Sequence, residues 1–418
     1  MKIVIFFGLL TLSLFVFLYK PAPIEVIEIK AEILNIELER QMALRYLNDL
    51  RQNSGISPYS YSEILEKSAT AHANYLITNN TTGHIEVTSK QDFTGEYPSN
   101  RAAKAHYNVS SIAENLTSNS LNYKRSIDDL FSAIYHRFGF LDFISDEIGI
   151  GIVQNSTDSN KNSFVYNMGL KELNRLCSGK GYHGNEVSAY KICADKTLHI
   201  EKRVFLRALN KEKKMSKKIV LYPYHNQVDV PPVFYNETPD PLANHDVSGF
   251  PISIQFNDYY HHKVNLLSLR LYKESEEEIT NTLLMNSHND PNKIFNSNQY
   301  ALFPLERLEY NTKYKAIASY RIKRKVFTRE WSFYTRKLKE PFSIVNTNNA
   351  SITIKPHIKH TIYFKPIDTH DTIKNLKFPA DVHVSFLDNN TIELTLTTDN
   401  TDNFKLQSDM KVVQIKVE

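Results

Sequence analysis

Three polar residues in the first half of the chain have the side chains to do chemistry: His84, Glu114 and His136. His84 follows Gly83, Glu114 stands in the run Ala-Glu-Asn-Leu, and His136 precedes an arginine. Two imidazoles and a carboxylate that meet in a cleft can hold a divalent metal ion such as zinc, or exchange protons with a bound molecule. Their irregular spacing does not bring them together by itself, so the elements that carry them decide whether they meet.

Helical periodicity dominates to about residue 150. Apolar spacing predicts a helix in 24–60 that stops at Gly55, a second helix capped by Ser60 and Glu63, and a third beginning at Ser126. Residues 113–116 are expected to precede a helix or turn, and strands are expected at 148–153 and 164–166. This pattern predicts an α+β or α/β/α domain of about 130 residues.

The first twenty residues predict export. After Lys2, an almost unbroken apolar run extends from Ile3 to Tyr19, and Lys20 and Pro21 end it. Such a run is typical of a secretory signal or of an N-terminal membrane anchor. Because no small-x-small cleavage site follows, we expect an uncleaved anchor at 1–20, with the rest of the chain exported; a secreted or periplasmic product remains the alternative if cleavage occurs.

Export changes how the two cysteines are interpreted. Cys177 and Cys193 flank a loop rich in turn residues, and in an oxidising compartment they are expected to form a disulfide, with two inert free thiols as the alternative. The region 173–218 is expected to be a connector, and its basic stretch at 202–218 is either a solvated segment or a contact with an anionic envelope surface.

The second half of the chain reads as strands only. Residues 219–338 predict a β-sandwich, in which 308–316 resembles the tyrosine corner of immunoglobulin-like or fibronectin-III-like domains. Residues 340–418 predict a smaller β domain. The net charge of +4 over 418 residues is too weak to indicate a nucleic-acid partner, and two cysteines exclude a Cys-rich zinc module.

The order of the motifs resembles the CAP superfamily, also called SCP or PR-1-like, in its bacterial secreted form. The resemblance covers about residues 40–170. Its motifs are Leu47-Asn48-Asp49-Leu50-Arg51, Ala71-His72-Ala73, Gly83-His84, Ala113-Glu114-Asn115-Leu116, Tyr135-His136-Arg137, Glu147-Ile148-Gly149-Ile150-Gly151 and Phe164-Val165-Tyr166-Asn167-Met168-Gly169.

The resemblance implies an α-β-α sandwich over 35–172, with His84, Glu114 and His136 lining a cleft. Members with two His and two Glu can hold a divalent ion there. This chain departs from that set, because Tyr166-Asn167 occupies the final strand where many eukaryotic members have a histidine. Glu147 or Glu86 is a candidate second acid, and His72 is expected to pack in the core.

Three functions from different classes remain open at this point. The first is an exported CAP-domain protein that binds a ligand, a lipid or another cell-envelope component through the cleft. The second is a metal-assisted hydrolase acting on peptide or cell-wall bonds, with the two histidines and Glu114 activating water. The third is a purely structural envelope protein. The sequence offers no Gly-x-Ser-x-Gly motif and no free cysteine beside a base, so the first interpretation is favoured.

Overall fold

The computed structural model describes residues 33–418 except 374, 380–381, 400–401 and 409–410. The chain divides into two compact units. Within the described residues, the larger unit holds 33–339 and 366–372, and the smaller unit holds 340–365 and 373–418. The predicted anchor at 1–20 lies outside the described residues. Among the helices that are described, none has both the length and the apolar character needed to cross a bilayer.

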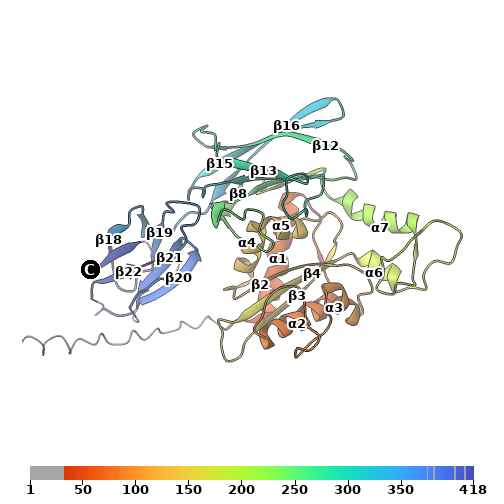
Figure 1. Cartoon of the computed structure of the whole chain (residues 1–418), viewed down its shortest axis with the longest axis horizontal. Coiled ribbons are helices and arrows are strands. Elements are labelled where there is room, and N and C mark those ends of the chain that lie inside the picture. The colour runs from red at the N-terminus through yellow and green to blue at the C-terminus, as the bar shows by residue number, and fades with distance from the viewer. Residues whose placement is uncertain (1–32, 374, 380–381, 400–401, 409–410) are drawn as a thin grey trace, which may run out of the picture. The chain divides into compact units, whose positions relative to one another are not determined.

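A four-stranded sheet with helices on both faces forms the first part of the larger unit (Figure 1). The strand order is β1-β3-β4-β2, with β1 parallel to β3 and the other neighbours antiparallel. The strands are β1 (Ser60–Tyr61), β2 (Ala113–Ser118), β3 (Glu147–Gln154) and β4 (Asn162–Gly169). The helices are α1 (Ile36–Ser54), α2 (Glu63–Thr78), α3 (Pro98–Lys104), α4 (Tyr123–Ser132) and α5 (Ile134–Phe140).

The two faces of this sheet have separate cores. Ile148, Ile150 and Ile152 of β3 pack with buried residues of α1 and α4, whereas Val165 of β4 packs with alanines of α2. In β3 the intervening residues are glycines, and a Cβ on Gly149 would lie 2.0 Å from the backbone nitrogen of Glu66 in α2. Only glycine lets α2 come this close, so the Gly-x-Gly pattern sets the spacing of the layer. The expected α-β-α sandwich is confirmed.

The structure corrects the expected limits of the first two helices. The stop at Gly55 is confirmed, since Gly55 has a φ of 101° and its N–H bonds the last turn, but α1 begins only at Ile36. The cap of α2 is Ser62, whose hydroxyl accepts a hydrogen bond from the N–H of Leu65. Ser60 is not the cap, because it pairs with β3 as the start of β1.

Two features of the segment that carries the site residues were not expected from the sequence. Residues 113–118 form strand β2, paired along its whole length with β4. The helix expected from Ser126 begins at Tyr123, capped by Asn122, and it breaks at Ala133 into α4 and α5. The break matters because it gives His136 a helix of its own.

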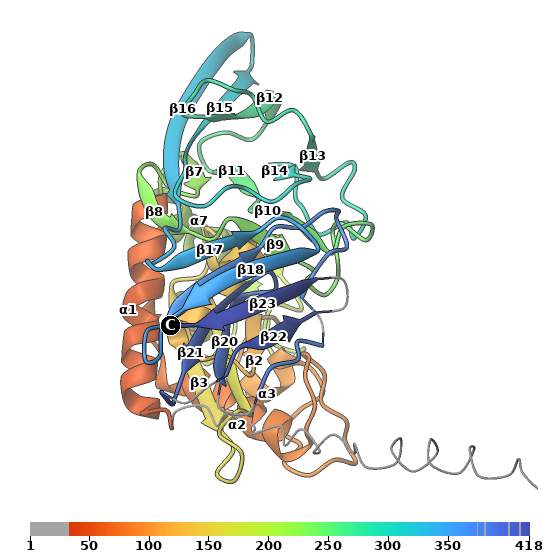
Figure 2. The same ribbon diagram turned by 90° about the vertical axis from the view of Figure 1, so that its left-hand side faces the viewer.

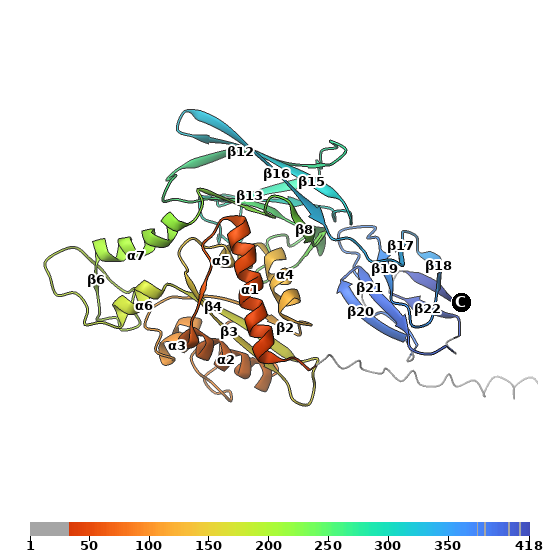
Figure 3. The same ribbon diagram turned by 180° about the vertical axis from the view of Figure 1, so that it is seen from behind.

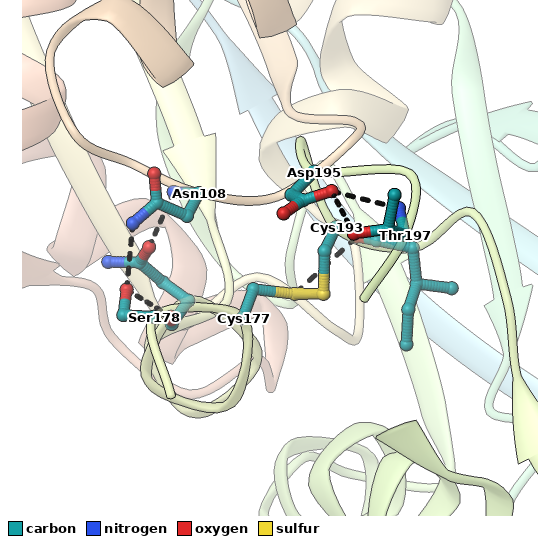
Figure 4. Close-up of a disulfide and its surroundings, with 8 residues drawn as sticks. Asn108, Cys177, Ser178, Cys193, Asp195 and Thr197 are labelled. Atoms are coloured by element: carbon teal, nitrogen blue, oxygen red, sulfur yellow. Dashed lines mark hydrogen bonds between the residues drawn. A yellow bond between two sulfur atoms is a disulfide. The ribbon is translucent and has the colours of Figure 1, made fainter. Parts of the chain in front are cut away.

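The connector is more ordered than its sequence indicates. It holds most of α6 (Lys171–Cys177), the short pair β5 (Ser188–Ala189) and β6 (Ile200–Glu201), and α7 (Lys202–Met215), so much of the basic stretch is a helix. Cys177 and Cys193 form a disulfide with a sequence separation of 16, which confirms the expected pairing (Figure 4). The disulfide lies in a small apolar cluster with Leu65 and Tyr107, so it ties the connector to the sheet domain.

Two four-stranded sheets follow as a β-sandwich within the same larger unit (Figure 3). Their orders are β13-β14-β11-β7 and β12-β15-β16-β8, and β9 pairs with β10 beside them. The strands are β7 (Ile219–Tyr222), β8 (Gln227–Val230), β9 (Val233–Tyr235), β10 (Val247–Gly249), β11 (Ile252–Phe256), β12 (Val264–Lys273), β13 (Thr282–Asn286), β14 (Gln299–Pro304), β15 (Lys313–Ile322) and β16 (Lys325–Thr335).

One continuous core joins the sheet domain to the sandwich. Buried residues of α1 and α4 belong to the same apolar cluster as Ile252 and Trp331 of the sandwich. Arg137 of α5, fully buried, donates hydrogen bonds to the carbonyl of Pro251 and to the hydroxyl of Ser253. The expected domains 35–172 and 219–338 therefore form one compact unit, and their boundaries stay a prediction.

The geometry expected of a tyrosine corner occurs in the sandwich. The hydroxyl of Tyr314 accepts a hydrogen bond from the backbone N–H of Glu309, five residues upstream, at 2.9 Å. Tyr314 is buried at the start of β15 and stacks on Phe333. This contact closes the turn before β15, as the sequence predicted; membership of the immunoglobulin-like class stays a prediction.

The smaller unit consists of strands around a separate core. Its sheets have the orders β17-β19-β21-β20 and β18-β23-β22. The strands are β17 (Phe342–Val345), β18 (Asn349–Ile354), β19 (His360–Phe364), β20 (Val382–Asp388), β21 (Thr391–Leu396), β22 (Phe404–Gln407) and β23 (Val412–Val417). The fold class expected from the sequence, α+β followed by β-sandwich material, is confirmed.

Candidate functional site

Glu114 occupies the centre of the site, on strand β2. Its side chain is 1% exposed, and both carboxylate oxygens accept hydrogen bonds from one nitrogen of Arg101, at 2.7 and 2.9 Å. The Nδ1 of His84 approaches the same carboxylate at 3.0 Å. Burial alone would raise the pKa of Glu114, but the hydrogen bond from His84 and the charge of Arg101 hold it below its ordinary value. Glu114 is therefore an ionised acceptor, and Nδ1 of His84 is the donor.

His84 lies in the turn that follows α2, directly after Gly83, whose φ of 101° favours glycine. Its side chain is 39% exposed, so the ring is open to solvent on one side and bonded to Glu114 on the other. Since Nδ1 is used by the carboxylate, the nitrogen that remains for a ligand is Nε2.

His136 is held in the same way, by a carboxylate from outside the sheet domain. Its Nδ1 lies 2.9 Å from an oxygen of Glu237, which stands between β9 and β10 of the β-sandwich. The Glu237 side chain is 3% exposed and also accepts hydrogen bonds from the backbone N–H groups of Ile134 and Tyr135. Glu237 thus fixes both the start of α5 and the ring that α5 presents.

The two imidazoles face each other. The rings of His84 and His136 are stacked, with centroids 6.4 Å apart and an interplanar angle of 26°. Asn115, the neighbour of Glu114, donates a hydrogen bond to the carbonyl of His136 at 2.8 Å. Strand β2 therefore positions both rings, His84 through Glu114 and His136 through Asn115. We call His84 and His136, with their carboxylates Glu114 and Glu237, the histidine pair.

A buried polar network lies behind the pair. His72 is fully buried, with Nδ1 2.8 Å from Glu86 and Nε2 3.0 Å from the carbonyl of Gly83. Burial alone would raise the pKa of Glu86, but hydrogen bonds from His72 and from the N–H of Thr94 hold it below its ordinary value. Arg101 of α3 lies between the two acids, 2.7 Å from Glu114 and 3.7 Å from Glu86. The network fixes the turn that carries His84.

The structure brings the three predicted residues into one neighbourhood but does not join them in one contact set. Glu114 binds His84, and His136 stacks on His84 while its own acid is Glu237. Of the candidate second acids, Glu147 bonds the hydroxyl of Tyr107, and Glu86 is buried behind the pair. Whether a cleft opens over the pair stays a prediction.

Sequence reasoning missed Arg101 and Glu237. A signal for Arg101 existed, because two acids expected in one cleft require a buried cation between them. Glu237 had no such signal, since it lies about a hundred residues from His136 in a part of the chain that reads only as strands. His72 is as expected a buried residue, although it is bound to an acid rather than packed only among apolar groups.

The donor atoms do not fit a three-ligand metal centre. The oxygens of Glu114 are occupied by Arg101 and His84, and those of Glu237 by backbone N–H groups and His136. Within the part of the chain that is described, no group of three or more His, Cys, Asp or Glu side chains has an arrangement that holds a metal ion. The carboxylates orient the rings, and the zinc site expected at His84, His136 and Glu114 stays a prediction.

The segment that carries His84, Glu114 and His136 matches a known family. Residues 44–168 match the family model of the cysteine-rich secretory protein family, CAP, and this segment is a CAP domain. The match covers less than a third of the chain and ends before the connector, so it does not extend to the sandwich or the smaller unit.

Two solved structures are similar to about a third of this chain. An outer surface protein from Borrelia burgdorferi is 19% identical over 33% of this chain and 97% of that chain, with a TM-score of 0.29. An extracellular protein containing an SCP domain from Bacillus anthracis strain Ames is 14% identical over 32% of this chain and 40% of that chain, with a TM-score of 0.27. No curated protein matches the chain.

Proposed function

We propose that this chain is an exported CAP-domain protein that binds a cell-envelope component or a lipid through a cleft lined by His84, Glu114 and His136. The observation that carries the proposal is the histidine pair. Each ring is fixed through Nδ1 by a buried carboxylate and leaves Nε2 for a ligand. A ring held in one orientation loses little entropy when it binds, which suits recognition of a hydroxyl or amide group.

Binding is favoured over catalysis by what accompanies the pair. Both cysteines of the chain are in the disulfide, so neither is a nucleophile. Hydrolysis by the pair would require a water activated by a metal, and the carboxylates that would serve as ligands are already engaged.

Export is supported by two independent features. The apolar run at 3–19 is typical of a secretory signal or anchor, and the Cys177–Cys193 disulfide is typical of an oxidising compartment. Anchoring by residues 1–20 belongs to this proposal, as does attachment of the chain to a membrane by that segment.

The test compares the full chain with the variant His84→Ala/His136→Ala. Co-sedimentation with purified peptidoglycan and titration with a fluorescent fatty acid measure binding. We expect at least one of these probes to bind the wild type and to lose most of its affinity with the double variant. The matched control removes two exposed histidines from the sandwich, His262→Ala/His288→Ala, and is expected to bind as the wild type does.

Three results would overturn the proposal. Binding that survives in the double variant places the ligand elsewhere. Absence of binding to both probes favours a structural role. Release of soluble fragments from peptidoglycan, lost in the double variant and restored by added zinc in the wild type after chelation, favours the hydrolase.

A further inference from the structure

The hairpin formed by β15 and β16 carries an unbalanced cluster of cations at its tip. Figure 2 shows this hairpin extending away from the other sheet of the sandwich. Residues 317–329 contain five cations and no acid, which is more positive charge than the whole chain carries in net. With Lys263 at the end of the neighbouring strand, we call these side chains the basic tip: Lys263, Arg321, Lys323, Arg324, Lys325 and Arg329.

The cations of the basic tip are exposed and unneutralised. All six side chains are exposed, and none of them forms an ion pair with a residue that the structure describes. The basic helix α7 differs in part, because some of its cations are paired: Arg203 with Glu201 at 2.9 Å and Lys213 with Asp258 at 2.7 Å. Like charges held together without counter-charges repel one another, so the basic tip is expected to attract anions.

One cation of the basic tip, Lys323, has a strained backbone conformation. Ile322 pairs with Lys325, which leaves Lys323 and Arg324 as a two-residue turn. Lys323 has a φ of 55°, the left-handed region where such hairpins favour glycine or asparagine. The chain therefore has a lysine where glycine or asparagine would form the turn with less strain.

Apolar side chains accompany the cations. Val326 is 54% exposed and Phe327 41% exposed, directly after Lys325. The Phe327 ring stacks on buried Tyr320 with a centroid distance of 5.8 Å, so it is held in place rather than free to fold away. A soluble polyanion would leave these groups in water, whereas the boundary of a bilayer accepts apolar side chains beside phosphate groups.

We propose that the basic tip is a membrane-contact surface that binds the anionic headgroups of a phospholipid bilayer, with Val326 and Phe327 entering the interface. This surface is separate from the histidine pair, and its function does not depend on the ligand of the pair. It would hold the sandwich against the bilayer independently of any anchor at 1–20.

The test measures partition of the full chain onto vesicles of phosphatidylcholine with and without phosphatidylglycerol. The variant Lys323→Gln/Arg324→Gln/Lys325→Gln removes three cations from the exposed turn. Because each cation near an anionic surface contributes about fivefold, the loss of three should be on the order of 100-fold on anionic vesicles. Binding to pure phosphatidylcholine should not change, and binding of the wild type to anionic vesicles should weaken as salt is added.

The matched control removes three exposed cations of α7 that form no ion pair with a described residue, Lys202→Gln/Arg207→Gln/Lys214→Gln. We expect it to bind anionic vesicles as the wild type does. The variant Val326→Ser, checked for folding by circular dichroism, should weaken binding to anionic vesicles without changing its salt dependence.

Equal loss in the α7 variant and the turn variant would overturn the proposal, because the effect would then follow net charge. Unchanged binding in the turn variant would also overturn it. Tighter, turn-dependent binding to soluble polyphosphate than to anionic vesicles would assign the tip to a polyanion instead.

Discussion

Glu237 of the β-sandwich accepts a hydrogen bond from Nδ1 of His136 in the CAP domain, at 2.9 Å. His84 has the equivalent contact with Glu114, which belongs to the CAP domain itself. The two rings of the site are therefore oriented by acids from different parts of the chain, one in the CAP domain and one in the sandwich. The segment matched by the family model supplies only three of the four groups of the histidine pair.

Removal of the sandwich carboxylate should release His136. In Glu237→Ala the Nδ1 proton has lost its acceptor, so the neutral ring should populate both tautomers. Nitrogen NMR shifts of His136, recorded where the imidazole is neutral, should show a protonated Nδ1 in the wild type and a mixture in the variant. Glu237→Gln keeps one acceptor oxygen and should lie between them. A wild-type ring protonated on Nε2 would contradict the contact.

The same substitution should cost stability. Glu237→Ala leaves the N–H of Ile134 without its carboxylate acceptor, and a buried unsatisfied donor costs about 1–3 kcal/mol. Urea unfolding of the full chain measures the loss. Glu277→Gln, which alters an exposed acid of the same sandwich, should change the free energy of unfolding by less than about 0.5 kcal/mol. Equal effects in the two variants would refute the capping role of Glu237.

Arg101 should be indispensable to the buried network. In Arg101→Met the carboxylates of Glu114 and Glu86 lose the cation between them, and breaking a buried pair costs about 3–5 kcal/mol. Adding Glu114→Gln should recover part of the loss, because the uncompensated charge is then removed. Strictly additive losses in a double-mutant cycle would show that the two side chains are not coupled.

Acid should unfold the CAP domain through these carboxylates. The pKa values of Glu114 and Glu86 are held below their ordinary value in the folded chain, so the unfolded chain binds protons first as the pH falls. Their contribution is therefore complete above the ordinary pKa of about 4.5 and is lost as the pH falls through the lower folded value.

Glu114→Gln should make the free energy of unfolding less dependent on pH in this acidic range, although Glu86 keeps part of the slope. Glu277→Gln serves again as the control and should keep the slope of the wild type. An unchanged slope in Glu114→Gln would show that Glu114 titrates alike in the folded and unfolded chains.

The disulfide should stabilise the connector and its attachment to the sheet domain. Closing a loop of this size contributes about 3 kcal/mol. Cys177→Ser/Cys193→Ser should lower the melting temperature, and a reductant should lower it in the wild type but not in the variant. This role would be contradicted if the reductant left the melting temperature of the wild type unchanged while alkylation showed that both thiols had become free.

The tyrosine corner gives a prediction for the sandwich. Tyr314→Phe removes the acceptor of the Glu309 N–H and keeps the ring stacked on Phe333, so it should cost about 1 kcal/mol or slightly more. Tyr334→Phe, on the exposed side of β16, is the matched control and should have little effect. Equal effects of the two substitutions would argue against the corner.

Features that depend on residues close together in the sequence could be predicted from the sequence. Gly55 ended α1, the Gly-x-Gly of β3 gave a strand that α2 can approach closely, and the cysteine loop gave the disulfide. The motif order located His84, Glu114 and His136 in one neighbourhood.

Long-range partners were not predictable in the same way. Residues 113–116 lack a strong strand pattern, and β2 exists because β4 offers it a full ladder of hydrogen bonds. The break at Ala133 accompanies the carboxylate of Glu237, which caps a helix about a hundred residues away. Residues 202–215 are helical although their charges suggest a solvated coil, since Ala208 and Glu212 are buried against neighbouring elements.

The core shared by the CAP domain and the sandwich has a consequence for how such a chain can be divided. A gene fragment that encodes only the CAP segment would expose Arg137 and the apolar faces of α1 and α4 to water, and it would lack the acid that orients His136. Replacing the sandwich with another module would remove Glu237 and so change the histidine pair directly. A fragment that keeps the pair intact therefore has to include Glu237 of the sandwich as well as the CAP segment.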